Sequence, residues 1–108
     1  GISPDELNII AAVARYHRRG GPKLSHPEFT CLLPEQRVLV MKLAGILRIA
    51  DALDRSRLHQ IRNISVSYDD ENLYVKTNAS YDLAIEKLEV KKKKDIFTGV
   101  FGLKVVVE

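Results

Sequence analysis

The segment from Val38 to Leu53 constrains this chain most, because it is apolar at almost every angle of a helical wheel. A helix that is apolar all round is usually buried. Yet Arg48, Asp51 and Arg55 follow one another at i, i+3 and i+7, so they form one charged stripe on that helix. Since a buried charge without a partner is costly, the stripe must meet solvent, a partner segment or an anionic ligand.

The start of the chain carries the signals of a helix N-terminus. Ser3 and Pro4 suit the cap and the first helical position, and Glu6 completes a capping box. Apolar residues then recur at helical spacing, which predicts an amphipathic helix to about Arg19. The Gly-Gly-Pro sequence at 20–22 ends it, because glycine favours helix C-termini and proline cannot continue a helix.

A second and longer helix is expected from Pro34 to about Leu58, after a connection over residues 20–33. Proline again stands at an early helical position. Gly45 lies in the middle of this helix, where glycine costs about 1 kcal/mol relative to alanine. This glycine therefore indicates that another helix packs closely there.

After Arg62 the apolar periodicity changes from helical to alternating. Residues 64–68 and 73–77 each alternate between apolar and polar side chains. Between them lies Asp-Asp-Glu-Asn at 69–72, which is typical turn chemistry. The pattern predicts a β-hairpin with one apolar face.

One further helix is expected over residues 82–101, with Gly102 as its C-terminal cap. Residues 103–107 alternate again and predict a last strand. The helix positions expected to face inward are Ile85, Leu88, Ile96, Phe97 and Val100. The predicted fold class is α+β, with a helical segment of two main helices over 1–60 and a small β-β-α-β unit over 61–108.

The composition is that of an ordinary soluble globular protein, with 108 residues, 45% hydrophobic and 29% charged. No apolar run approaches the ~20 residues that span a bilayer, and no signal-peptide pattern is present. Cys31 is the single cysteine, so an internal disulfide and a cysteine-based zinc cluster are excluded. We therefore expect a cytoplasmic protein with no membrane partner.

Basic residues gather in two places, although the net charge of +3 is a mild excess. One cluster surrounds His17 and precedes two glycines whose backbone N–H groups can approach an oxyanion, and arginine suits phosphate oxygens through its planar fork. The candidate polyanion-binding residues are Arg15, His17, Arg18, Arg19, Lys23, His26, Arg48 and Arg55. A solvated helix end explains the same charges without a ligand, and the lysine run 91–94 is open to both interpretations. Nucleic acid is not expected, because its binders usually show a clear basic stripe.

The sequence offers few elements of a catalytic site. It has no nucleophile-elbow serine and no Walker A or GxGxxG pattern, and its three histidines are too scattered for a zinc site. Asp51 is compatible with a metal ligand or with ion pairs to Arg48 and Arg55 on its own helix face. We assign no catalytic residue. Asp51 and His17 are the candidate metal ligands, although no metal is expected because flanking guanidinium groups oppose a divalent cation.

A series of motifs along the chain resembles one known family. It comprises Ala-Arg-Tyr-His-Arg-Arg at 14–19, Pro-Lys at 22–23, His-Pro-Glu-Phe at 26–29, and the segment 43–56 with Leu-Arg-Ile-Ala-Asp-Ala-Leu-Asp-Arg-Ser at its centre. Asp-Ile-Phe at 95–97 and Val-Phe-Gly-Leu at 100–103 extend the series. In this order and spacing, the motifs are similar to the C-terminal region of exopolyphosphatase and its pppGpp-phosphatase relatives, the Ppx/GppA family, over nearly the whole chain.

The resemblance implies a longer parent protein, which fits a chain that begins Gly-Ile-Ser and has its one methionine at Met41. Two N-terminal actin-like domains of that family hold magnesium and the catalytic carboxylate, and they hydrolyse the terminal phosphoanhydride of polyphosphate or pppGpp. An HD-like helical domain and a small α+β domain follow, and this chain resembles the second half of the former plus the latter. Asp51 matches the final metal-ligating aspartate of the HD class, and His17 is a candidate match for a later histidine. No His-Asp pair occurs here, so the metal site is expected to be incomplete.

These observations give the hypothesis of a polyphosphate-binding, regulatory and dimerisation region of an exopolyphosphatase-like enzyme. We expect the chain itself to be inactive and without a cofactor, with Mg²⁺ confined to the parent enzyme. The expected partners are polyphosphate or pppGpp, the parent's actin-like domains and a second copy in a homodimer. Two alternatives stay open: an HD-type metal-dependent phosphohydrolase domain, and a structural module whose charged stripe docks another domain.

Overall fold

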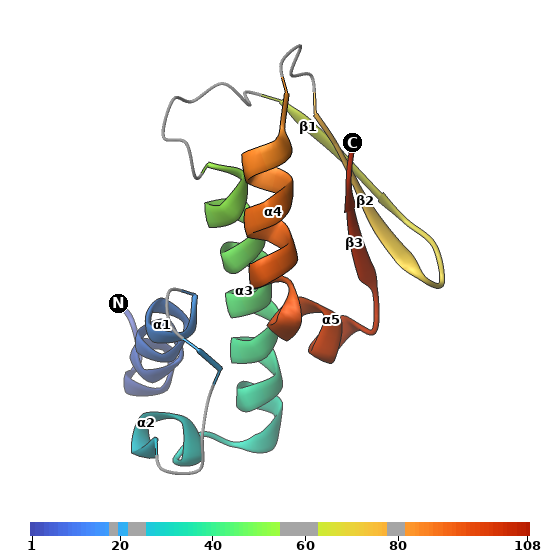
Figure 1. Cartoon of the computed structure of the whole chain (residues 1–108). Coiled ribbons are helices and arrows are strands. Elements are labelled where there is room, and N and C mark those ends of the chain that lie inside the picture. Colours follow the sequence, from blue (N-terminus) through green and yellow to red (C-terminus); the bar gives the residue numbers. More distant parts are fainter. Residues whose placement is uncertain (18–19, 22–25, 55–62, 78–81) are drawn as a thin grey trace.

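The computed structural model describes residues 1–17, 20–21, 26–54, 63–77 and 82–108. Helices come first and a sheet with its own helices follows (Figure 1), which confirms the predicted α+β class. In chain order the elements are α1 (Pro4–Tyr16), α2 (Pro27–Thr30), α3 (Pro34–Leu53), β1 (Ile64–Tyr68), β2 (Asn72–Thr77), α4 (Ala84–Lys93), α5 (Asp95–Phe101) and β3 (Lys104–Val107). No helix of the described ranges is both long enough and apolar enough to cross a membrane.

Helix α1 begins as the sequence predicts. The backbone N–H of Glu6 donates to Ser3 Oγ at 3.2 Å, and the Ser3 N–H donates to Glu6 Oε1 at 3.4 Å, so the capping box is confirmed. The helix ends at Tyr16, and His17 caps it through a backbone N–H bond to Val13 at 3.0 Å. The rest of the predicted helix, Arg18 and Arg19, lies outside the described residues.

Within the connection expected over 20–33, the structure has the short helix α2. Pro27 occupies its first turn, and the Thr30 hydroxyl donates back to the His26 carbonyl at 3.2 Å. Phe29 then packs against the core that α1 and α3 form. The buried residues of this first core are Ala12, Val13, Tyr16, Leu32, Val40 and Ala44.

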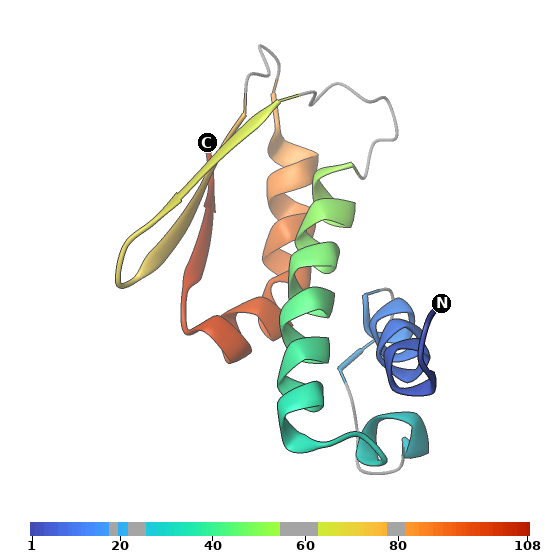
Figure 2. The same cartoon turned by 180° about the vertical axis from the view of Figure 1, so that it is seen from behind.

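Helix α3 is the central element, with α1 on one side and α4 and α5 on another (Figures 1 and 2). A Cβ atom added at Gly45 would lie 3.0 Å from the Cα and from the N of Phe97. The predicted close packing at Gly45 is thus confirmed, and its partner is α5. The helix ends at Leu53, because the backbone of Asp54 leaves the helical region, and the remainder of the predicted helix lies outside the described residues.

The prediction of one continuous helix over 82–101 is wrong. Lys94 separates α4 from α5, and two of the positions expected to face inward are exposed, Ile85 at 62% and Leu88 at 53%. Helix α4 instead buries Glu86 and Val90. Its buried face follows from its packing against α3, which its own apolar pattern does not encode.

The sheet has the order β1-β2-β3, with β1 antiparallel to β2 and β2 parallel to β3. The hairpin is confirmed, and so is the cap at Gly102, whose φ of 71° is left-handed. Helices α4 and α5 provide the crossover that a parallel pair requires. The second core is formed by Ile49, Ala52, Val90 and Phe97, with partly buried Leu53, Leu73, Leu103, Val105 and Val107 against it.

Candidate functional site

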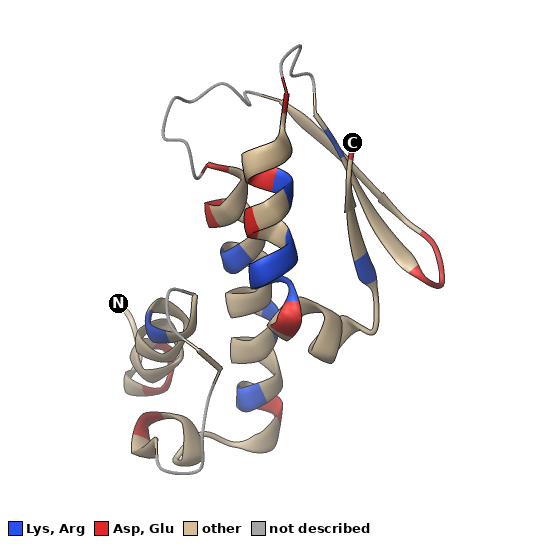
Figure 3. Ribbon diagram, in the orientation of Figure 1, with Lys and Arg blue, Asp and Glu red and all other residues tan. Residues whose placement is uncertain are grey.

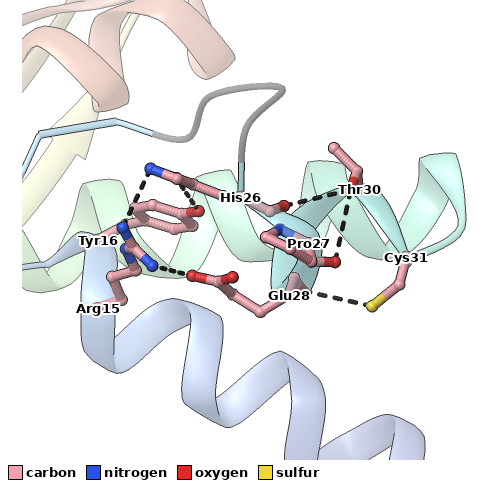
Figure 4. A network of polar contacts seen from close by, with 7 residues as sticks. All are labelled: Arg15, Tyr16, His26, Pro27, Glu28, Thr30 and Cys31. Carbon is pink, nitrogen blue, oxygen red and sulfur yellow. Dashed lines mark hydrogen bonds and ion pairs between the residues drawn. The ribbon is translucent and has the colours of Figure 1, made fainter.

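A polar network joins the end of α1 to α2 (Figure 4). Arg15 forms an ion pair with Glu28, and its Nη2 lies 3.0 Å from Nε2 of His26. The other ring nitrogen of His26, Nδ1, lies 2.7 Å from the hydroxyl of Tyr16. A guanidinium group can only donate hydrogen bonds, so Nε2 accepts and the ring proton sits on Nδ1, directed at the Tyr16 oxygen.

The charges of this network largely compensate one another. The residue's own backbone N–H has the largest effect and lowers the pKa of the Glu28 carboxyl. Desolvation opposes it, and the Arg15 charge and hydrogen bond lower the pKa further. Burial raises the pKa of the Tyr16 hydroxyl, and the Glu28 charge adds to this. An external anion can therefore bind the Arg15 guanidinium group only if it shares this group with Glu28 or displaces the Glu28 carboxylate.

Arg48 is buried between α1, α3 and the junction of α4 with α5. Its Nη1 donates to the Tyr16 carbonyl at 3.3 Å and its Nε to the Lys93 carbonyl at 3.4 Å, while Nη2 pairs with Asp95 Oδ1 at 3.0 Å. Carbonyl groups at helix C-termini carry partial negative charge, so the buried cation is well compensated. Arg48 is 5% exposed, which identifies it as a structural connection between helices.

These bonds bring together two basic segments that lie far apart in the sequence. Because one guanidinium group binds carbonyls of both Tyr16 and Lys93, the C-terminal ends of α1 and α4 meet at Arg48. A Cβ atom on Gly21 would lie 3.9 Å from Ile96, so the chain beyond α1 also contacts the start of α5. We call this meeting point, with the residues 15–17 and 91–94 around it, the convergence surface. Figure 3 colours the Lys and Arg positions of α1 and α4 blue on the ribbon.

The lysine run contributes the most accessible positive charge of the convergence surface. Lys91 and Lys92 are exposed, whereas Lys93 and Lys94 are partly buried. Lys92 Nζ lies 3.6 Å from the Glu89 carboxylate, and its side chain remains 60% exposed. Exposed lysines of this kind can bind phosphate oxygens without first breaking a buried contact.

The structure places some of the predicted site residues together, and others lie outside the residues that it describes. Arg15 and His26 belong to the α1–α2 network, and His17 caps α1 beside it. Arg48 lies beneath the convergence surface. Four further candidates lie outside the described residues, namely Arg18, Arg19, Lys23 and Arg55.

The candidate metal ligands lie on different helices, Asp51 within α3 and His17 at the end of α1. Over the described ranges, no group of three or more His, Cys, Asp or Glu side chains is placed to hold a metal ion.

Sequence reasoning missed two features of this region. It did not connect the lysine run to the His17 cluster, and it did not foresee that Glu28 occupies Arg15. A signal for the second was available, because Arg15 and Glu28 both stand within the quoted motif series. The first depends on Arg48 reaching the Lys93 carbonyl, a contact across 45 residues that no local pattern encodes.

A scan against protein-family models gives no match for this chain, and a search of curated proteins finds no similar sequence.

Proposed function

We propose that this chain is a polyphosphate-binding, regulatory and dimerisation region of an exopolyphosphatase-like enzyme. The motif series suggests the family, whose members hydrolyse the terminal phosphoanhydride of polyphosphate or pppGpp. The observation that carries the anion-binding role is the meeting of the α1 and α4 ends at Arg48, because it joins two basic segments into one surface. Catalysis is assigned to the parent's actin-like domains, which also hold Mg²⁺.

A linear phosphate polymer suits such a surface. It carries a negative charge at every phosphate unit, so several cations in a row can bind it together. Each cation adds a modest, salt-dependent contribution to the binding affinity. Lys91 and Lys92 supply exposed cations on the α4 side, and Arg15, which the anion would share with Glu28, supplies one on the α1 side. Arg48 has no direct contact with the anion in this proposal, since it holds the two sides together from beneath.

Measured affinity for long-chain polyphosphate tests this proposal. We expect the double variant Lys91→Gln, Lys92→Gln to bind about tenfold more weakly than the wild type, because it loses two phosphate contacts. The matched control is Lys76→Gln, Lys104→Gln, which removes the same charge from exposed positions on the sheet. The control should change the affinity by less than about twofold.

Two results would count against the proposal. Equal weakening by the two double variants would mean that net charge alone governs binding. Release of phosphate from polyphosphate by the purified chain, dependent on added Mn²⁺ or Mg²⁺, would favour the HD-type phosphohydrolase instead. We also expect Arg18→Ala with Arg19→Ala to weaken binding, since these arginines adjoin His17 in the sequence.

A further inference from the structure

Strand β1 is an open edge of the sheet over the described residues. Its sequence, Ile-Ser-Val-Ser-Tyr, has no charge and no proline, which are two of the usual means of blocking an edge strand. The Asp69 N–H donates to the Asn72 carbonyl at 3.0 Å, so this pair is hydrogen-bonded. Hydrogen bonding alternates along an antiparallel ladder, so Ser67 and Ser65 also point their backbone groups toward β2. The backbone groups of Ile64, Val66 and Tyr68 point the other way, out of the sheet.

The same three residues carry the apolar side chains of β1, and these are left uncovered. Ile64 is 52% exposed, Val66 57% and Tyr68 76%. They line a groove of about 750 Å³ that separates β1 from α3. On the α3 side the groove is lined by Ile46, Ile49, Ala50 and Leu53.

Helix α3 adds a second uncovered apolar surface on the same side. Leu43, Ile46 and Leu47 are 40%, 49% and 43% exposed, and their spacing of i, i+3 and i+4 places them in one stripe. Ile46 belongs to both the stripe and the groove. The open strand edge, the groove and the stripe are therefore continuous, and Figure 2 shows α3 and β1 together on the side turned away from α4.

We propose that this continuous surface binds a second copy of this chain, with β1 pairing antiparallel to the partner's β1 across a two-fold axis at Val66. In this register Val66 faces the partner's Val66, and Ile64 faces the partner's Tyr68. The backbone N–H and C=O groups of all three residues point out of the sheet, so each N–H can donate to a carbonyl of the partner strand. The strand carries no charge, so no like charges face each other across the axis.

The two-fold axis also accounts for the groove and the α3 stripe. Strands that pair in one continuous sheet have their axis perpendicular to it, so both α3 helices lie on the same face of the joint sheet. The apolar groove under β1 then lies in the interior of the dimer, between the two helices. A two-fold interface uses the same surface of both copies, so that surface must be complementary to itself. The five-residue strand meets this condition because its outward-pointing backbone groups are arranged evenly about its central residue.

The proposed function includes a homodimer, and this inference rests on that part of it and gives the dimer its surface. The anion-binding role is separate, because the convergence surface uses other residues. A monomeric variant that still binds polyphosphate would uphold that role on its own. The two proposals can therefore fail independently.

Disulfide cross-linking in the 108-residue chain tests the register. The exposed Cys31 is first replaced by serine, and Val66→Cys is then introduced. Opposed residues of a hydrogen-bonded pair have Cα atoms about 5.5 Å apart, within the range of a disulfide. Mild oxidation should convert most of this variant into a species of twice the 12.2 kDa chain mass. Ser67→Cys is the matched control on the same strand. In the proposed register residue 67 faces the partner's Ser65 and lies about 7–8 Å from residue 67 of the partner, so this variant should remain mostly without a disulfide cross-link.

Sedimentation equilibrium tests the association itself. The Cys31→Ser chain should be dimeric, whereas Val66→Lys should be monomeric because two lysines would meet at the axis. Ser67→Lys, which points to the other face of the sheet, should remain dimeric, and circular dichroism checks that each variant is folded. A strict monomer at high concentration would overturn the proposal. So would a dimer that survives Val66→Lys and gives no Val66→Cys cross-link, since its interface or its partner surface would then be another one.

Discussion

One guanidinium group connects three parts of the fold. Arg48 is on α3, yet its hydrogen bonds reach the end of α1, the end of α4 and the first residue of α5. Two of its acceptors are backbone carbonyls at helix ends, which have few other donors available. The residue that the sequence presents as an anomaly in an apolar helix is therefore the one that fixes how the helices meet.

Replacing Arg48 by methionine tests this role. The variant keeps most of the apolar stem but leaves the Tyr16 and Lys93 carbonyls without this donor, at a cost of roughly 3 kcal/mol in the free energy of unfolding. Arg48→Lys should recover only part of the loss, because one ammonium group cannot reach all three acceptors. Urea denaturation measures both. Lys42→Met, an exposed change on the same helix, should alter stability little, and an equal loss there would contradict the role of Arg48.

Asp69 has a comparable local role in the hairpin. Its Oδ1 accepts the backbone N–H groups of Glu71 and Asn72, each at 2.8 Å, and its Oδ2 accepts the Tyr74 hydroxyl at 2.9 Å. These bonds, led by the Glu71 and Asn72 N–H groups, lower the pKa of Asp69 below its ordinary value of 3.8. The carboxylate therefore adds stability above pH 3.8, and this is lost as the pH falls through the lowered pKa.

We accordingly expect Asp69→Asn to lower the urea midpoint at neutral pH, with a difference from wild type that shrinks as acid protonates Asp69. Asp70→Asn is the matched control, because it removes the same charge from the neighbouring exposed turn position. Urea unfolding at several pH values measures the difference. A difference independent of pH, or one equally large for Asp70→Asn, would show that the charge of Asp69 is not what stabilises the turn.

At the scale of elements, α3 and α5 approach so closely at Gly45 that an added Cβ would be tighter against Phe97 than an ordinary van der Waals contact. Alanine favours a helix over glycine by about 1 kcal/mol, but a Cβ there would lie 3.0 Å from two Phe97 backbone atoms. Backbone cannot yield as a flexible side chain can, so the steric cost exceeds the gain in helix propensity. We expect Gly45→Ala to destabilise the fold by about 1–2 kcal/mol.

Gly99 in α5 provides the opposite case. A Cβ added there meets nothing within 4 Å, so Gly99→Ala should stabilise the protein by up to about 1 kcal/mol. Thermal or urea unfolding compares the two variants. If both substitutions stabilise the protein, α3 and α5 are farther apart than the structure has them.

The sequence predicted elements whose signals are local. The capping box of α1, the start of α3, the hairpin and the cap at Gly102 all depend on residues within a few positions of each other. The break at Lys94 and the buried face of α4 were missed, since both depend on contacts with α3. The same distinction applies to the candidate site. Its basic clusters are visible in the sequence, but their meeting at Arg48 and the pairing of Arg15 with Glu28 are tertiary.

At the scale of the whole molecule, the chain is extended for its length. Its radius of gyration is 15.0 Å, with dimensions of 45 × 31 × 27 Å, against about 13 Å for a compact domain of this size. The open shape leaves two surfaces on different elements. One is the basic convergence surface at the ends of α1 and α4, and the other is the apolar surface of β1 and α3.

The central claim is that an anionic polymer binds at the convergence surface, and an NMR titration tests it most directly. Backbone amide signals are followed while polyphosphate is added to the isotope-labelled chain at low salt and again at high salt. We predict shifts that cluster at His17 and at residues 91–94 and that weaken with salt. Absence of shifts, or shifts centred on Lys76 and Lys104 of the sheet, would contradict the claim.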